Sequence, residues 1–200
     1  MISIKEFSDI LPIKCRYGEL NFLSFDKLDW YVDNCRKDYY NEHLDFNFKS
    51  DITREDLYDT FYNLVIGQKL KEKSDTEARL VLKNEVNDCI GGALAYELQR
   101  NNVIELAYFV VPEYQHMGIA YDMLKSMIEA LNKSKLKFRG FIATIQYDNV
   151  ASINLVKKLG FRLLSEADGK YKKNITMYLD RTYETWSLTR QKRYNSYIME

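Results

Sequence analysis

The segment 103–111 constrains the fold more than any other part of the chain. Its sequence, VIELAYFVV, is apolar on both faces of a strand, with Glu105 as its one charged position. Alternate side chains of a strand point to opposite faces of a sheet, so such a segment is typical of a central strand that is covered on both sides. Pro112 ends the strand, because proline has no amide hydrogen to donate. The chain is therefore expected to build a sheet with helices on both faces.

Other periodic segments surround this strand. Residues 26–43 and 53–73 carry apolar residues at helical spacing, and Thr53 with Asp56 resembles a capping box at the start of the second helix. Strands are predicted at 78–83 and 89–98, with turn-forming pairs at 87–88 and 101–102, which gives an antiparallel meander. A helix over 118–131, a strand over 138–145, a helix over 149–159 and strands over 161–166 and 175–180 follow. This order predicts a mixed α/β sheet, an antiparallel meander leading into a right-handed strand–helix–strand unit.

Composition and charge exclude several classes of protein. The chain is 46% hydrophobic and holds 8 Gly and 2 Pro, which argues against disordered or linker-rich architectures. Its three cysteines form no CxxC pair, so we expect no disulfide framework and no metal site. No apolar run is long enough for a signal peptide core or a membrane span, and a cytoplasmic protein without membrane contact is expected.

The net charge is zero, but the charges are unevenly distributed. Residues 1–100 hold 14 basic and 19 acidic side chains, whereas residues 101–200 hold 15 and 10. Overall neutrality argues against a dedicated nucleic-acid binder. The two halves are expected to meet different partners.

A candidate anion site follows the central strand. The stretch VVPEYQHMGIA, residues 110–120, is a loop whose single glycine, Gly118, lies where a helix begins. Helix N-termini carry unpaired N–H groups that bind phosphates, and glycine allows close approach of a ligand to the backbone. One glycine before a helix is also explained by ordinary capping, so this segment alone leaves both interpretations open.

A second segment, NVASINLVKKLGF over 149–161, adds a family resemblance. Together the two segments resemble the GNAT superfamily of acetyl-CoA-dependent acyltransferases. The pattern [QR]-x-x-G-x-[GA] is matched by Gln115, Gly118 and Ala120, and N-x-x-[AS] followed by Gly-Phe is matched by Asn149, Ser152 and the Gly-Phe pair at 160–161. The Glu105 strand and the Ser152 variant look most like the branch of ribosomal-protein alanine N-acetyltransferases. The resemblance is strong over residues 80–161.

The resemblance implies a GNAT acyl-CoA N-acyltransferase fold in which the strands 103–111 and 138–145 splay apart around acetyl-CoA. A single domain over 1–183 is expected, with a C-terminal tail or helix at 184–200. The cofactor would contact Phe109, Val110, Val111, Gln115, His116, Met117, Gly118, Ile119, Ala120, Asn149, Ser152 and Lys158. An exposed loop histidine and a solvated helix face are the ordinary alternatives for His116 and Lys158.

The resemblance also implies the chemistry, in which an amine attacks the thioester directly. Glu105 is the candidate base, acting through water, and its alternative is a structural carboxylate at the start of a strand. The backbone N–H of Val110 or Val111 would stabilise the oxyanion. Many family members protonate the thiolate with a helical tyrosine, but Val156 stands at that position. Ser152 is the replacement candidate, with a plain role in the first helical turn as the alternative.

The acceptor is expected to be the primary amine of a peptide N-terminus or of a small cationic molecule. Residues 26–59 mix ten carboxylates with aromatic side chains, and an acidic, aromatic wall would attract a cation. Two amphipathic helices with solvated acidic faces are the alternative. The basic, aromatic tail suggests RNA contact or, more simply, packing on the domain or in a homodimer. A non-catalytic CoA-binding or ribosome-associated module is the alternative function.

Overall fold

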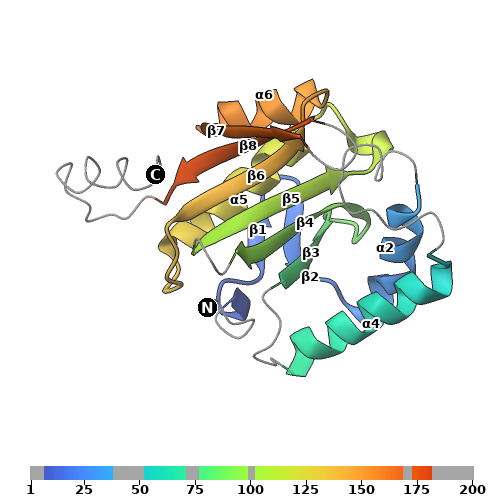
Figure 1. Ribbon diagram of the computed structural model, residues 1–200. Coiled ribbons are helices and arrows are strands. Elements are labelled where there is room, and N and C mark those ends of the chain that lie inside the picture. The colour runs from blue at the N-terminus through green and yellow to red at the C-terminus, as the bar shows by residue number, and fades with distance from the viewer. Residues whose placement is uncertain (1–6, 38–51, 71–76, 99–101, 169–172, 182–200) are drawn as a thin grey trace.

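The central feature of the fold is one eight-stranded sheet in the order β1-β2-β3-β4-β5-β6-β8-β7 (Figure 1). The computed structural model describes residues 7–37, 52–70, 77–98, 102–168 and 173–181. The strands are β1 (Ile13–Cys15), β2 (Gly18–Phe22), β3 (Glu77–Lys83), β4 (Cys89–Leu98), β5 (Val103–Val110), β6 (Gly140–Gln146), β7 (Arg162–Asp168) and β8 (Lys173–Asp180). The helices are η1 (Phe25–Lys27), α2 (Leu28–Cys35), α4 (Arg54–Leu70), η2 (Pro112–Tyr114), α5 (Ile119–Lys133) and α6 (Val150–Lys158).

The pairing of β5 with β6 differs from every other contact in the sheet. These strands are parallel and pair only at Ile104 with Phe141 and at Glu105 with Ile142, whereas the other neighbours are antiparallel. Beyond Glu105 the two strands therefore diverge and leave the sheet open between them. The predicted mixed sheet, with its antiparallel meander and splayed central strands, is confirmed.

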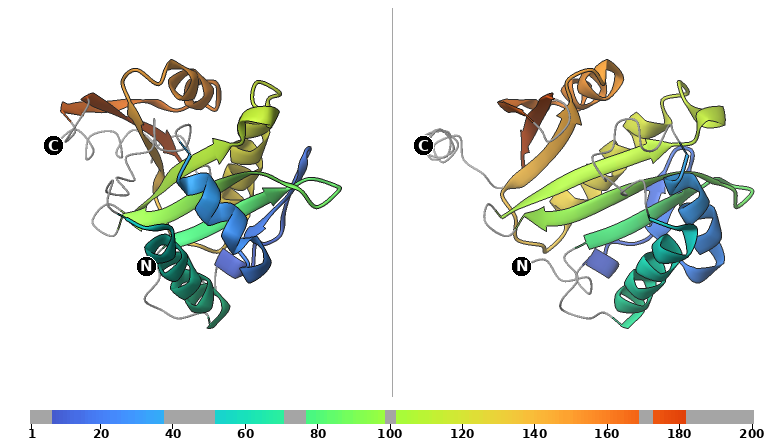
Figure 2. Two further views of the ribbon diagram at one scale, coloured as in Figure 1. Left: turned by 90° about the vertical axis from the view of Figure 1, so that its right-hand side faces the viewer. Right: turned by 45° about the vertical axis from the view of Figure 1, so that its right-hand side comes forward.

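Helices cover both faces of the sheet, as expected from the apolar central strand (Figure 2). Leu80 and Leu82 of β3 pack in the core that contains α5 and α6, whereas Val81 between them packs in the core that contains α2 and α4. This alternation is the two-residue period of a strand with both faces buried. The loop after β5, the candidate anion site of the sequence, leads into α5 in the first of these layers.

The N-terminal half differs from the predictions in detail. The helix expected over 26–43 is a 3₁₀ turn followed by α2, which ends at Cys35, and residues 38–43 lie outside the described part. The helix expected over 53–73 is α4, whose described part ends at Leu70. The capping box is present: the Asp56 N–H donates to Thr53 Oγ1 at 3.1 Å, and the Thr53 N–H donates to Asp56 Oδ2 at 3.0 Å.

The β1–β2 hairpin was not predicted. β1 has three residues, too few for an alternating pattern to be recognised, and β2 alternates polar and apolar residues over only five. The hairpin packs closely on the sheet, because a Cβ atom at Gly18 would lie 1.8 Å from the Lys83 carbonyl oxygen. Tertiary contact, more than local propensity, therefore defines this hairpin.

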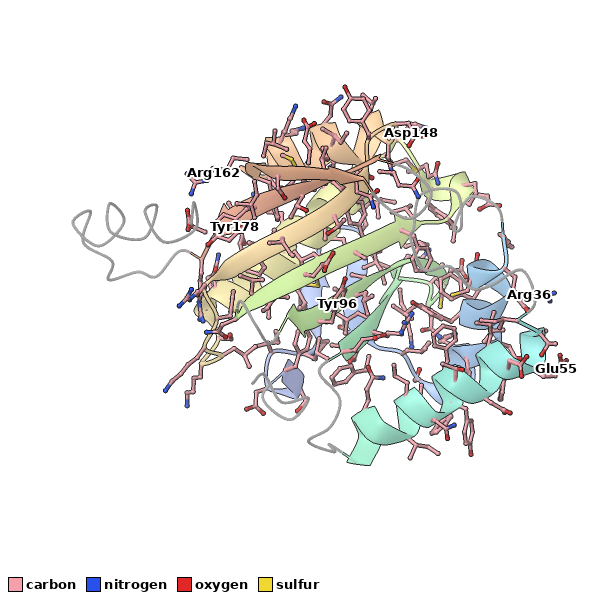
Figure 3. All side chains as sticks on the ribbon, in the orientation of Figure 1. Arg36, Glu55, Tyr96, Asp148, Arg162 and Tyr178 are labelled. Carbon is pink, nitrogen blue, oxygen red and sulfur yellow. The ribbon has the colours of Figure 1, made fainter. Side chains whose placement is uncertain are left out.

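The opposite edge of the sheet is formed by β7. Arg162 of β7 donates to Asp180 of β8 at 2.8 Å and lies 5.9 Å from the centre of the Tyr178 ring (Figure 3). None of the helices in the described ranges is long and apolar enough to cross a membrane. The predicted tail, 184–200, lies outside the described residues, and the domain boundaries of 1–183 remain a prediction.

Candidate active site

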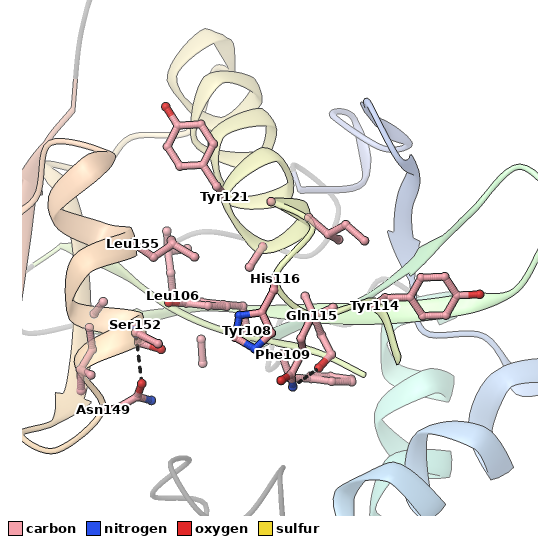
Figure 4. A pocket seen from close by; sticks show the side chains of 18 of the residues that line it. Leu106, Tyr108, Phe109, Tyr114, Gln115, His116, Tyr121, Asn149, Ser152 and Leu155 are labelled. Carbon is pink, nitrogen blue, oxygen red and sulfur yellow. Dashed lines mark hydrogen bonds between the residues drawn. The ribbon is translucent and has the colours of Figure 1, made fainter. Parts of the chain in front are cut away.

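A cavity of about 490 Å³ opens where β5 and β6 diverge (Figure 4). Its walls come from β5, the loop with η2, the first turn of α5, β6 and the first turns of α6. The lining residues are Leu106, Ala107, Tyr108, Phe109, Val110, Tyr114, Gln115, His116, Gly118, Ile119, Ala120, Tyr121, Ala143, Thr144, Ile145, Asn149, Ala151, Ser152 and Leu155. The two segments singled out in the sequence thus meet at one cavity.

The loop before α5 presents its backbone as an anion site. Gln115 ties the loop to β5, since its Nε2 donates to the Val110 carbonyl at 2.9 Å. His116 and Gly118 have positive φ angles of 60° and 82°, and the glycine tolerates this left-handed conformation without strain. The N–H groups of residues 116–121 have no hydrogen-bond acceptor among the described residues. Unpaired amides at the N-terminus of a 15-residue helix favour a phosphate.

The open edge of β5 offers further backbone groups. The Val111 N–H donates to the Ile90 carbonyl of the β4 side at 3.1 Å. In an antiparallel pair, alternate residues direct their N–H and C=O groups toward the partner strand, so those of Val110 face the opening toward β6. Of the two amides expected to stabilise an oxyanion, Val111 is therefore used within the sheet, and only Val110 faces the cavity side.

The α6 side of the cavity is fixed by a helix cap. The Asn149 side chain accepts from the Ser152 N–H at 3.0 Å, which places both residues at the start of α6 (Figure 4). Tyr108 of β5 lines the same wall. Burial raises the pKa of the Tyr108 phenol to about 12, and the neighbouring Ser152 hydroxyl offsets part of the rise. The phenol therefore stays protonated at neutral pH.

The cavity includes nine of the twelve residues predicted to contact the cofactor, and the other three lie just outside its wall. Val111 bonds with Ile90, and the Met117 side chain is exposed. Lys158 Nζ lies 4.8 Å from the centre of the ring of Tyr121, which does line the cavity. Of the two predicted catalytic residues, Ser152 lines the cavity and Glu105 does not.

Glu105 lies where β5 and β6 are still paired, one residue before the first lining residue of β5. Its side chain is 9% exposed and lies across from Tyr96 of β4. Burial raises the pKa of Tyr96, and the charge of Glu105 and a hydrogen bond with it raise it further. Glu105 and Phe109 share a face of β5, because they are four residues apart. This face is the one toward α2 and α4.

Several lining residues were missed in the sequence. These include Tyr108, Tyr114, Tyr121 and Thr144. The two-residue period of VIELAYFVV places Tyr108 on the face opposite Glu105, but the sequence does not show which face meets α6. Thr144 is the exposed residue within an otherwise buried β6, and only the divergence of β5 and β6 identifies it as a lining residue of the cavity.

The predicted acidic, aromatic wall separates into two parts. Trp30 of α2 stacks on Phe109 with ring centres 6.1 Å apart, so the aromatic part does reach the wall of the cavity. Asp29 and Asp33 instead bind Arg54, at 2.6 and 2.8 Å, and join α2 to α4. Residues 38–51, with four of the ten carboxylates, lie outside the described part. The described residues contain no cluster of three or more potential metal ligands.

Comparisons with known proteins agree with this geometry. Residues 29–162 match the family of acetyltransferase (GNAT) domains. Among curated proteins, the uncharacterized N-acetyltransferase YnaD of Bacillus subtilis is 30% identical over 108 residues, which is 52% of this chain. The chain spans 59% of the length of that relative.

Solved structures share the fold at low identity. Spermidine N-acetyltransferase from Vibrio cholerae, in complex with CoA and spermine, has a TM-score of 0.67 and 16% identity, covering 81% of this chain and 94% of that chain. The ribosomal L7/L12 α-N-protein acetyltransferase RimL, in complex with coenzyme A, has a TM-score of 0.70 and 14% identity, covering 85% and 97%. The match over two thirds of the sequence and the splayed sheet lead to one conclusion: the chain belongs to the GNAT family of acetyltransferase domains.

Proposed function

We propose that this chain is an N-acetyltransferase that transfers the acetyl group of acetyl-CoA to the primary amine of a peptide N-terminus or of a small cationic molecule. The observation that carries the proposal is the cavity between β5 and β6, whose wall includes the loop before α5 with its unpaired amides. Family membership supports the same activity.

The residues present fit acetyl-CoA. The amides of residues 116–121 would hold the pyrophosphate, and the backbone of Tyr108 on the open edge of β5 would pair with the pantetheine arm. Glycine is favoured at position 118 by its φ of 82° and not by lack of space, because a Cβ placed there would lie in ordinary contact with Tyr17 Oη, at 3.9 Å. When bound, acetyl-CoA supplies the thioester from which the acetyl group is transferred.

Three groups of the chain would assist the transfer. The Val110 N–H donates to the developing oxyanion from the open edge of β5. Ser152, at the start of α6, donates the proton that the departing thiolate needs. Glu105 takes up the ammonium proton through water, since it lies outside the cavity wall and faces the same side of the sheet as Phe109.

The acceptor would approach from the face covered by α2 and α4. There the stacked pair of Trp30 and Phe109 forms an aromatic surface on which a cationic amine can rest. The acceptor classes named for the solved neighbours are a polyamine and a ribosomal protein. Both carry a primary amine, and this shared chemistry is what we propose for the acceptor.

We also propose that the protein works in the cytoplasm, which is a reducing compartment. None of the three cysteines, Cys15, Cys35 and Cys89, forms a disulfide. Burial raises the pKa of the Cys15 thiol to about 11, which keeps it protonated and unreactive.

A non-catalytic CoA-binding module is the second candidate. It is favoured by Val156, a fully buried apolar residue at the position where a helical tyrosine would protonate the thiolate. Such a module would bind CoA through the same loop without promoting transfer.

One experiment separates these functions. The protein is incubated with acetyl-CoA and a panel containing spermidine, a peptide with N-terminal alanine and the same peptide with a blocked N-terminus, while released CoA thiol is measured. Thiol release that depends on a free amine is expected, and Gly118→Val, strained at a φ of 82°, should abolish it. CoA binding without release would favour the second candidate. Absence of CoA binding in the wild type would refute both.

A further inference from the structure

The turn of the β1–β2 hairpin contacts the loop that precedes α5. The Tyr17 hydroxyl donates to the Met117 carbonyl at 2.7 Å, across 100 residues of sequence. Next to it, the Arg16 N–H donates to Asp122 Oδ2, in the first turn of α5, at 2.7 Å. Two hydrogen bonds thus join the hairpin to the loop and to the helix that together form the anion site.

The bond to Met117 fixes the direction of an amide in that site. A trans peptide is planar, so the carbonyl oxygen of Met117 and the N–H of Gly118 point in opposite directions. Tyr17 holds the oxygen on the hairpin side. Gly118 lines the cavity, whereas neither Tyr17 nor Met117 does. The Gly118 N–H is therefore directed away from the hairpin, toward the cavity.

This peptide needs an external lock. Rotation of the Met117–Gly118 peptide changes ψ of Met117 and φ of Gly118, and glycine accepts both signs of φ at little cost. The exposed Met117 side chain does not anchor the peptide, and the Gly118 N–H has no acceptor among the described residues. A flipped peptide would turn a carbonyl oxygen toward the phosphates and repel them.

We propose that Tyr17 is a positioning residue that locks the Met117–Gly118 peptide so that the Gly118 N–H faces the pyrophosphate of acetyl-CoA. This inference rests on the proposed function, because it concerns the same cofactor. It assigns to the hairpin, which lies on the far side of α5 from α6, a role in donor affinity. Gly18 supports this role by letting the hairpin approach Lys83 closely enough to hold the turn in place.

The test compares Tyr17→Phe with the wild type. The phenylalanine ring keeps the packing beside Arg16 and removes only the hydroxyl, so the variant should fold with an unchanged melting temperature. Loss of one neutral hydrogen bond predicts that Kd for CoA and KM for acetyl-CoA rise about 3- to 10-fold. The kcat at saturating acetyl-CoA should stay within about twofold, because the bond acts on binding and not on the reacting atoms.

Two controls isolate the lock. S-acetylpantetheine lacks the pyrophosphate, so its kcat/KM should be the same for Tyr17→Phe and the wild type. Glu19→Gln removes the ion pair with Lys14 on the same hairpin and should leave Kd for CoA unchanged. Equal CoA affinities for Tyr17→Phe and the wild type, or an equal loss with S-acetylpantetheine, would overturn the role of Tyr17. A wild type that does not bind CoA would instead refute the proposed function itself.

Discussion

Replacement of Arg181 by methionine should cost a large part of the stability of the domain. Arg181 follows β8 and is 6% exposed, and its guanidinium donates to the main-chain carbonyls around the C-terminus of α5. These acceptors are Leu136 at close contact, Ser134 at 2.8 Å, Asn132 at 3.2 Å and Leu131 at 3.4 Å. The guanidinium carbon also lies 4.1 Å from the centre of the Phe138 ring.

The magnitude follows from what the substitution leaves behind. Methionine fills most of the volume but donates no hydrogen bond, so carbonyls at the end of α5 lose both their partner and the positive charge that favours a helix C-terminus. A buried acceptor left without its donor costs about 1–3 kcal/mol, so the loss of the guanidinium from several carbonyls should cost about 3–5 kcal/mol. For a domain of this size, that corresponds to a fall in Tm of roughly 6–20 °C.

Urea unfolding followed by circular dichroism measures this cost, and the chain provides a matched control. Arg162 is also an arginine near the end of the sheet, but its side chain is 55% exposed and its partner is Asp180. Exposed ion pairs contribute about 1 kcal/mol or less, so Arg162→Met should change the unfolding free energy by no more than that. If Arg181→Met were as mild as Arg162→Met, the proposed capping of α5 would be wrong.

Three further predictions concern the site. Glu105→Gln should lower kcat about 10²-fold, as loss of a general base does, and an unchanged pH–rate profile would remove Glu105 from the mechanism. Ser152→Ala should lower kcat and leave Kd for CoA unchanged, because the helix cap uses the Ser152 N–H and not its hydroxyl. A weaker Kd for CoA, measured by calorimetry, would show that the hydroxyl acts in binding and not in proton transfer. Tyr108 has a pKa of about 12 against 10.0 ordinarily, so the unfolded chain loses that proton first and stability falls as pH rises from 10 to 12. Tyr108→Phe should lose up to about 3 kcal/mol less over that interval, and equal losses in both proteins would contradict the buried phenol.

The structural predictions that agree with the structure are those that rest on short segments of the sequence. The loop from Gln115 to Ala120 and the cap formed by Asn149 each lie within a few residues, so their spacing alone specifies the backbone. The apolar residues on both faces of β5 likewise predicted a strand that is buried on both sides. These features follow from steric and hydrogen-bonding rules that act along the chain.

The predictions that needed revision depend on residues far apart in sequence. Trp30 meets Phe109 because α2 packs on one face of the sheet, and Tyr17 meets Met117 because the β1–β2 hairpin, at the edge of the sheet, lies beside α5. The carboxylates expected to attract a cation could not be distinguished from those that bind Arg54, since that choice is made by the contact of α2 with α4.

The sequence by itself determined the family, the order of the strands and helices after the β1–β2 hairpin, and the position of the loop before α5. Only the tertiary structure decided which groups of the chain face the cavity. Strand pairing takes up the Val111 N–H and leaves that of Val110 at the open edge, and it sets Glu105 where β5 and β6 are still paired, outside the wall. The physical reason is that pairing register joins residues on separate strands, and nothing within one strand specifies its neighbour's position.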